Sequence, residues 1–185
     1  DSKESIVALE TMMAGKYILI GRPAQSFISM YPSGDQRRTT FYRRITTTTS
    51  TLLKGGSEQF NCTFRSAEFY LTAAEAAARL GQRAEAIGYL EQLAQKRYNA
   101  TAYATFQSNI ASLTDDQLVE EIVNERAREL AFEGHRWFDL RRTTMPALTK
   151  TYNGETFQLN ANDSRYTMRF PTEAVEANPN ISLWP

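Results

Sequence analysis

Residues 114–142 read TDDQLVEEIVNERARELAFEGHRWFDLRR, and this stretch decides the class of fold. Thr114 and the glutamine three residues later have the spacing of a capping box, and the two aspartates between them favour the positive end of a helix dipole. Apolar residues then recur at helical spacing as far as Phe132, and Gly134 is the kind of residue that ends a helix. We therefore predict a long helix that starts at Thr114, a break at Gly134 and a short helix over His135–Arg142.

The long helix carries charges on the side that its apolar residues mark as inward. At about 100° per residue, Arg126, Glu129 and Glu133 share the apolar face that begins at Leu118. The other charges are expected outside this face or at its edge, namely Glu120, Glu121, Glu125 and Arg128. A buried charge is costly unless it is paired, so the inward charges need partners. The candidates nearby in the sequence are Arg136, Asp139, Arg141 and Arg142.

These charges allow two interpretations. A carboxylate pair can serve catalysis or ligand binding, whereas a buried ion network holds one helix against another. No nucleophile accompanies Glu129 and Glu133, and an arginine beside them favours ionised, structural groups. We therefore favour the structural network and predict no catalytic residue in this stretch.

Residues 65–98 are predicted to form a helical hairpin. The first helix, Arg65–Leu80, has Ala, Leu, Phe and Tyr around most of its circumference, so we expect it to be buried on most sides. Gly81 then provides a left-handed turn, and Arg83–Lys96 follows as an amphipathic helix. The pair is similar to a single tetratricopeptide unit, which needs neighbours to bury its apolar face. We expect residues 99–113 to be a linker.

The first third of the chain, residues 1–64, is predicted to be a loop-rich segment. Glycine and proline punctuate it repeatedly, with a short helix near Glu4–Ala14 and strand character from Tyr17 onward. The threonine run over residues 46–49 favours extended structure. Aromatic side chains in such loops are able to form a binding surface.

The last segment, residues 143–185, is predicted to be a tail of turns and short strands. Strands are expected at Thr156–Leu159 and Arg165–Phe170, with one helical turn after Pro171. With residues 65–142 as the helical layer, the fold class is mainly α. It combines tetratricopeptide-like helical hairpins with an irregular layer of loops and short strands.

Composition excludes several classes of function. Lys and Arg total 21, as do Asp and Glu, so the formal net charge is zero and gives no reason to expect nucleic acid as a partner. No apolar run approaches the roughly 18 residues of a membrane span. The first residues lack the features of a signal peptide, so we expect any leader to lie outside this sequence.

Metal and cofactor sites are also not expected. Cys62 is the only cysteine and His135 the only histidine, so neither an internal disulfide nor a Cys/His metal cluster is predicted. The Gly34 turn lacks the residues of a phosphate-binding loop. We predict no cofactor, no metal and no enzymatic activity.

Four stretches resemble the SusD/RagB family of outer-membrane nutrient-binding lipoproteins. The stretch Ile122–Arg142 resembles the C-terminal signature of the family through Glu125-Arg126, Glu129-Leu130, Glu133-Gly134, Arg136-Trp137, Asp139-Leu140 and Arg142. Residues 64–76 look like the family's helix that follows a strand carrying an arginine. Tyr31-Pro32-x-x-Asp35-x-Arg37 is similar to a Tyr-Pro…Asp-x-Arg stretch, and residues 166–179 resemble the final strand and turn. The resemblance covers nearly all of the chain, in order.

The resemblance implies a location and a function. Residues 1–185 would be the C-terminal portion of one SusD-like domain, and an N-terminal lipid anchor outside this sequence would hold the protein at the outer membrane, on the cell surface. The implied function is non-catalytic capture of oligosaccharides or other nutrients for a TonB-dependent outer-membrane transporter. A peptide-binding family member, or a helical-repeat scaffold without a small ligand, are the alternatives.

Sugar binding would draw on aromatic faces, which stack on sugar rings. The candidates in the loop-rich first third are Phe27, Tyr31, Tyr42 and Phe60. The sequence does not name the glycan or peptide. A glycosidase is disfavoured because the clustered carboxylates are flanked by arginine, whereas glycosidases place a carboxylate pair across an open cleft.

Overall fold

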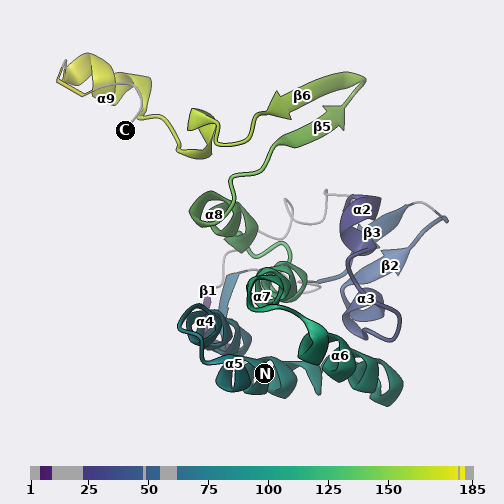
Figure 1. Ribbon diagram of the computed structural model, residues 1–185. Coiled ribbons are helices and arrows are strands. Elements are labelled where there is room, and N and C mark those ends of the chain that lie inside the picture. The colour runs from purple at the N-terminus through teal and green to yellow at the C-terminus, as the bar shows by residue number, and fades with distance from the viewer. Residues whose placement is uncertain (1–4, 10–22, 48, 55–61, 179, 182–185) are drawn as a thin grey trace. The chain divides into compact units, whose positions relative to one another are not determined.

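The computed structural model of the chain describes residues 5–9, 23–47, 49–54, 62–178 and 180–181 (Figure 1). The chain divides into two compact units, Asp1–His135 and Arg136–Pro185, which are described separately below. The predicted mainly α class is confirmed, since helices dominate the described residues. The assignment of the whole chain to one domain, in segments 1–64, 65–142 and 143–185, stays a prediction.

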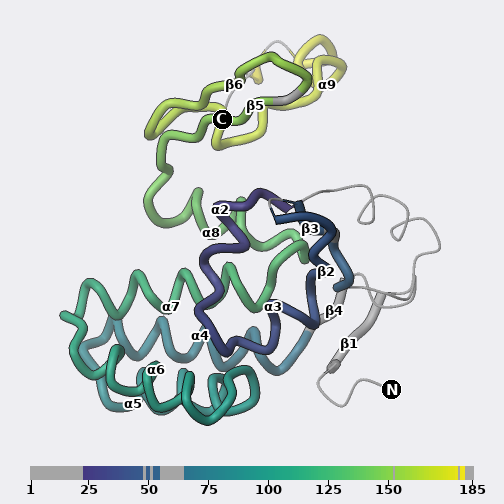
Figure 2. Tube along the Cα trace, turned by 90° about the vertical axis from the view of Figure 1, so that its right-hand side faces the viewer, coloured from purple at the N-terminus to yellow at the C-terminus, as the bar shows by residue number. Residues whose placement is uncertain are grey.

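Four helices form the main layer of the first unit. They are α4 (Ser66–Arg79), α5 (Arg83–Ala94), α6 (Ala100–Ser112) and α7 (Asp115–Glu129). Helix α4 packs against both α5 and α7, and α5 contacts α6. Figure 1 looks nearly along the axes of α4 and α7, and Figure 2 shows the same helices from the side. Their facing sides bury one apolar core, which includes Leu71, Ala74, Leu90, Leu93, Ile110, Leu118 and Ile122.

The predicted helix ends of this layer are largely confirmed. The Thr114 side chain accepts from the backbone N–H of Gln117, and the Gln117 side chain accepts from the Thr114 N–H, which completes the capping box. Gly81 has a φ of +75°, as a left-handed turn requires. Helix α7 ends at Glu129, before the predicted Phe132, since its C-cap Leu130 already departs from helical geometry with φ −96° and ψ +23°, and Phe132 has a φ of +63°. A short turn therefore separates the end of α7 from Gly134.

The prediction of a linker over residues 99–113 was wrong, because Ala100–Ser112 is a helix. Asn99 is its N-cap, and the side-chain oxygen accepts from the Ala102 N–H at 2.9 Å. Phe106 and Ile110, four residues apart, are buried against the helical core. The many Thr, Ser and Asn residues favoured a loop, but an N-cap followed by alanines and a buried pair at helical spacing outweighs them.

The predicted helix near Glu4–Ala14 was wrong for the part that the structure describes. Residues Ser5–Leu9 form strand β1, which pairs antiparallel with β4 (Cys62–Arg65). Strand pairing at this separation depends on a partner more than 50 residues away, which local sequence patterns do not show. The expected strand from Tyr17 onward lies outside the described residues.

Between these strands, a short helix pair precedes a hairpin. The helices are α2 (Gln25–Ile28) and α3 (Arg37–Thr40), and the hairpin joins β2 (Tyr42–Arg44) to β3 (Ser50–Leu52). The predicted extended run over residues 46–49 was wrong for the part that the structure describes, because the backbone N–H groups of Ile45 and Thr46 both donate to the Thr49 carbonyl and close the hairpin turn. A second small core forms here from Ile28, Tyr31, Tyr42 and Leu52.

The second unit begins within α8 (His135–Arg142), which confirms the predicted short helix. A hairpin of β5 (Leu148–Tyr152) and β6 (Glu155–Leu159) follows, and its two turn residues, Asn153 and Gly154, both have positive φ. Asn-Gly is the strongest short-range sequence signal for a hairpin turn. The second strand of this hairpin was predicted from the sequence, and the first was missed.

The C-terminal residues bring one further correction. The expected strand over Arg165–Phe170 was wrong, since Ser164–Tyr166 forms a single 3-10 turn, η1. Asp163 caps this turn by accepting from the Arg165 N–H, and the Tyr166 ring stacks on Trp137 at 4.9 Å. The predicted helical turn after Pro171 is confirmed as α9 (Thr172–Ala177). None of the helices in the described ranges combines the length and the apolar character that crossing a bilayer requires.

Candidate functional site

The first unit contains a buried ion network with Glu129 at its centre. Glu129 lies in the last turn of α7, and its side chain is 0% exposed. Arg97 donates to both carboxylate oxygens at 2.9 Å, Arg37 donates to Oε2 at 3.0 Å and Arg65 donates to Oε1 at 2.9 Å. Each carboxylate oxygen of Glu129 therefore accepts two N–H groups, and three guanidinium groups surround one negative charge.

Arg37 connects this centre to the loop before α3. Its Nε and Nη2 donate to the two carboxylate oxygens of Asp35 at 3.0 and 2.7 Å, and its Nη1 bridges Glu129 and Glu125. The guanidinium also lies over the rings of Tyr31 and Tyr98, at 5.8 and 5.6 Å from their centroids. Arg37 is 2% exposed, so a charge that is normally on the surface is here fully enclosed by acceptors and aromatic faces.

Glu125 extends the network along α7. It accepts from Arg37 Nη1 at 2.5 Å, from Arg128 Nη2 at 2.7 Å and from the Tyr98 hydroxyl at 3.3 Å. Arg128 in turn pairs with Glu121, two turns earlier on the helix. The run from Glu125 to Ala131 is buried at every position, so the C-terminal half of α7 is enclosed on all sides.

Glu133 and Lys54 form the outer end of the network. Arg65 Nη2 donates to Glu133 Oε1 at 2.8 Å, and the Lys54 ammonium lies 2.5 Å from the same oxygen. Lys54 and Arg65 also donate to the backbone carbonyl of Glu129, at 2.6 and 3.0 Å. The last turn of α7 thus has an acceptor carbonyl satisfied by cations, as the negative end of a helix dipole favours.

The protonation of the network follows from this geometry. Burial alone would raise the pKa of Glu129, but the hydrogen bonds from Arg97 and the charges of Arg37 and Arg65 hold it well below its ordinary value. The same balance, with Arg37 and Arg128 as the cations, lowers the pKa of Glu125. Burial lowers the pKa of Lys54 to about 8, although Glu133 opposes the shift.

The network is balanced in charge. It holds five cations and five carboxylates, namely Arg37, Lys54, Arg65, Arg97 and Arg128 with Asp35, Glu121, Glu125, Glu129 and Glu133. A buried carboxylate whose pKa is lowered stays ionised and does not act as a general acid near neutral pH. The arrangement suits a structural role, in which the helices and the loop before α3 are fixed to each other. Among the described residues, no His, Cys, Asp and Glu side chains cluster as metal ligands.

The sequence predicted the network but misplaced some of its members. Glu125 and Arg128 were expected outside the inward face or at its edge, and both are buried. Glu125 follows Leu118 by seven residues, which is close to two turns of about 3.6 residues, so both residues point the same way. Arg126 is buried as predicted, and it donates to Thr72 on α4 at 3.1 Å.

The cations that pair with Glu129 differ from the arginines expected near it in the sequence. Arg136, Asp139, Arg141 and Arg142 belong to the second unit, where Asp139 pairs with Arg142 at 2.7 Å. The cations that reach Glu129 come from earlier in the chain. Two of them, Arg37 and Arg65, lie in the stretches that resemble a known family. The third, Arg97, was missed, although it lies just past the end of α5 and follows the buried Leu90 by seven residues and the buried Ala94 by three.

The four aromatic candidates for sugar binding differ in how far they are buried. Tyr31 and Tyr42 are buried, with their hydroxyls 2.9 Å apart, and Tyr31 also donates to the Arg128 carbonyl at 2.7 Å. Phe27 is half-buried and packs edge-to-face against Tyr31 and Phe132. Phe60 lies outside the described residues. The structure gives Tyr31 and Tyr42 a packing role, and a role in ligand binding for any of the four stays a prediction.

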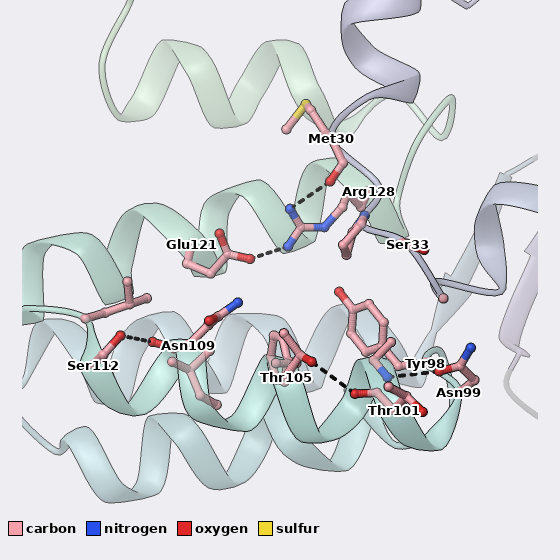
Figure 3. Close-up of a pocket in the computed structure, with 16 residues that line it drawn as sticks. Met30, Ser33, Tyr98, Asn99, Thr101, Thr105, Asn109, Ser112, Glu121 and Arg128 are labelled. Atoms are coloured by element: carbon pink, nitrogen blue, oxygen red, sulfur yellow. Dashed lines mark hydrogen bonds and ion pairs between the residues drawn. The ribbon is translucent and has the colours of Figure 1, made fainter.

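A pocket of about 710 Å³ lies between α6, α7 and the loop before α3 (Figure 3). Side chains of α6 form one wall, where Thr101, Thr105 and Asn109 follow each other at four-residue spacing. The Glu121–Arg128 pair of α7 faces them, and Arg128 reaches toward the Met30 carbonyl at 3.5 Å. Hydroxyl, amide and charged groups thus surround an apolar floor that includes Phe106 and Ile110. Such a lining is able to hydrogen-bond a small polar ligand.

Comparison with known proteins shows which family this chain is similar to. The family model described as the SusD family matches residues 25–185. Two curated proteins of Formosa agariphila are similar to the chain: SusD-like protein P38 is 38% identical over 81 residues, and SusD-like protein P2 is 32% identical over 120 residues. These alignments cover 43% and 63% of this chain but only 16% and 24% of the two relatives.

Two solved structures from Bacteroides vulgatus share the fold. A SusD-like carbohydrate-binding protein has a TM-score of 0.60 at 20% identity, over 97% of this chain and 48% of that one. A second protein, provisionally assigned as sugar binding, has a TM-score of 0.62 at 22% identity, over 88% of this chain and 38% of that one. At these identities the likeness concerns the fold. The chain spans less than half the length of the relatives that it matches.

Proposed function

Since this chain belongs to the SusD family, we propose that it is part of a non-catalytic cell-surface subunit that binds oligosaccharides. The subunit passes its ligand to a TonB-dependent transporter in the outer membrane. An N-terminal lipid anchor holds the subunit at this membrane. The observation that carries this proposal is the family match over residues 25–185. It includes every member of the buried ion network, from Asp35 to Glu133.

The geometry of the described residues supports binding without catalysis. Hydrolysis of a glycosidic bond requires one carboxyl group with a raised pKa beside the scissile bond. The buried carboxylates of α7 have the opposite character, because guanidinium groups fill the acceptor positions of Glu129 and lower the pKa of both Glu125 and Glu129. These groups maintain the structure, and the ligand binds elsewhere.

The pocket of Figure 3 is our candidate for a sugar-binding position. A sugar exposes hydroxyl groups that donate and accept, together with apolar C–H faces. The α6 wall presents the hydroxyls of Thr101 and Thr105 and the amide of Asn109 above an apolar floor. Sugar affinity in such a site is limited by the water that each hydroxyl group gives up. The names of the two Bacteroides vulgatus structures refer to carbohydrate or sugar binding, which favours a glycan over a peptide as the ligand.

A binding experiment tests the proposal. The full-length protein is screened on a glycan array, hits are measured by titration calorimetry, and each hit is incubated with the protein and assayed for new reducing ends. We expect saturable binding of at least one oligosaccharide without any release of reducing ends. Co-purification with an outer-membrane transporter tests the second half of the proposal. Absence of binding to every glycan on the array, or the appearance of new reducing ends, would contradict it.

A pair of variants tests the pocket. Thr105→Trp fills the space between α6 and α7, whereas Ser108→Trp adds the same side chain to the same helix at an exposed position that does not line the pocket. We expect Thr105→Trp to weaken sugar binding at least about tenfold, which corresponds to about 1.4 kcal/mol, and Ser108→Trp to leave it unchanged. Equal affinities in the two variants would remove the pocket from the proposal and leave the general function in place.

A further inference from the structure

A second pocket of the first unit, about 530 Å³ in volume, has a different chemical character. Helix α2 contributes Gln25 and Ile28 to its lining, and α3 contributes Arg38 and Thr39. The volume falls within the range of about 300–1,000 Å³ that is usual for small-molecule sites. Arg38 is exposed, so its guanidinium is accessible to a ligand.

The β2–β3 hairpin forms the other side of this pocket. Side chains alternate between the two faces of a strand, so Tyr42 and Arg44 share one face of β2 and Arg43 points to the other. Arg44 is paired with Ser50 across the hairpin, and Tyr42, Arg44 and Ser50 all line the pocket. Arg43 does not. The pleat of the strand therefore directs one of two adjacent arginines into the pocket.

The arginines of this region exceed its carboxylates. Residues 23–54 contain five basic side chains and a single acidic one, Asp35. Asp35 forms a salt bridge with Arg37, and Lys54 forms one with Glu133. Within the described ranges, no carboxylate lies within salt-bridge distance of Arg38 or Arg44.

Arg44 is held in place without being neutralised. Its Nε donates to the carbonyl of Thr46 in the hairpin turn at 3.0 Å, which orients the guanidinium and leaves its other N–H groups for a ligand. Two cations that line one concave surface raise the local concentration of an anion. The pocket thus offers two cations for a negative group, and a carboxylate or sulfate is the acceptor that matches the planar guanidinium fork.

We propose that this pocket binds the anionic group of an acidic sugar, either the carboxylate of a uronic acid or a sulfate ester. Arg38 and Arg44 bind the negative charge from two sides. The hydroxyls of Thr39 and Ser50 and the amide of Gln25 serve the sugar hydroxyls. The inference rests on the proposed function, because it names the class of glycan that the subunit captures. It also gives Tyr42, one of the aromatic candidates, a place in the wall of a ligand pocket.

The experiment uses two acidic probes with neutral counterparts. Tetragalacturonic acid is compared with its methyl ester, and a κ-carrageenan tetrasaccharide, which carries sulfate and no carboxylate, is compared with its desulfated form. Calorimetric titrations of the full-length protein are made at low and high salt. We expect at least one acidic probe to bind about tenfold or more tighter than its neutral counterpart, and more salt to weaken this binding. The pair that shows the difference identifies the carboxylate or the sulfate as the ligand group.

Variants connect the difference to the pocket. Arg38→Ala and Arg44→Ala should each weaken the acidic probe about tenfold and leave the neutral probe unchanged. Arg43→Ala removes the same charge from the adjacent residue on the opposite face of the strand, and should have a several-fold smaller effect. Melting temperatures equal to the wild type establish that the variants fold.

Three outcomes would overturn the inference. They are equal binding of acidic and neutral probes, wild-type affinity in Arg38→Ala and Arg44→Ala, or an equal loss in Arg43→Ala. Inorganic sulfate at high concentration should compete with the acidic probe, and a lack of competition would also count against it. Failure of the proposed function is distinct from these outcomes, since the protein would then bind no glycan on the array at all.

Discussion

Replacement of Glu129 by glutamine tests the structural role of the buried network most directly. The substitution keeps the size of the side chain and removes one negative charge that is 0% exposed. Four N–H groups from Arg37, Arg65 and Arg97 point at this carboxylate, at 2.9 to 3.0 Å. In Glu129→Gln, three guanidinium groups face a neutral amide whose NH₂ group is itself a donor, and the network acquires a net positive charge.

The magnitude follows from the loss of one partner in a buried ion pair, which costs about 3–5 kcal/mol. This is a large part of the roughly 5–15 kcal/mol by which a domain is stable. At about 2–4 °C per kcal/mol for a protein of this size, the melting temperature should fall by about 6–20 °C. Glu121→Gln is the matched control on the same helix, because Glu121 pairs with Arg128 at a side chain that is 29% exposed. Its cost should stay below about 1 kcal/mol.

Differential scanning calorimetry and urea unfolding of the full-length protein measure both variants. The pKa of Glu129 lies below its unfolded value, so the stability that it contributes is present above about pH 4.5 and is lost as the pH falls. Acid should therefore destabilise the wild type more than Glu129→Gln. The reasoning is refuted if Glu129→Gln unfolds within 1 kcal/mol of the wild type, or if it is no less stable than Glu121→Gln.

Three further predictions concern stability. The pKa of Lys54 is lowered to about 8, so above that pH the unfolded chain binds more protons than the folded one. Between pH 8 and pH 10.5 the stability of the wild type relative to Lys54→Met should therefore rise by about 2–3 kcal/mol. Urea titrations across this range measure the difference. Gly34→Ala should destabilise the protein by at least about 1–3 kcal/mol, because Gly34 has a φ of +84° and the new Cβ would lie 2.6 Å from the Ala102 Cβ. In the control Gly88→Ala, in α5, the new Cβ meets no atom within 4 Å, and the variant should be about 0.5–1 kcal/mol more stable than the wild type in the same unfolding experiments. Asn99→Ala removes the N-cap of α6 and should lower the free energy of unfolding by about 0.5–2 kcal/mol. Faster hydrogen exchange of the amides in the first turn of α6 would show that the loss occurs there.

The parts of the fold that sequence predicts are those that depend on neighbours a few residues away. Helices α4, α5 and α7 follow from apolar periodicity, and the Thr114 capping box follows from two residue types at a fixed spacing. Strand β1 was not predicted because its partner, β4, is far along the chain. Helix α6 was missed for a different reason, since its N-cap and its buried Phe106–Ile110 pair are local signals that were present.

The candidate site shows the same limit. The inward charges of α7 predict that a network exists, because buried charges need partners, but they do not say which segments supply the cations. Arg97 was open to detection from its spacing to the buried Leu90 and Ala94 of α5, which ends three residues before it. Lys54 carried no such signal, since it precedes a Gly-rich stretch that reads only as a loop. The two pockets depend on side chains from several elements and were beyond the reach of any pattern.

The sequence separations within the network have a consequence for how the fold is specified. The partners of Glu129 are 32, 64 and 92 residues away along the chain, so none of them comes from α7 itself. The contacts therefore form only when the start of α3, the end of β4 and the turn after α5 have all reached α7. An arrangement that misplaces one of these segments leaves a buried carboxylate or guanidinium without a partner, which costs several kcal/mol. We infer that the network contributes to the uniqueness of the fold more than to its net stability, because a set of apolar side chains would bury the same surface and tolerate shifts in register that these ion pairs do not.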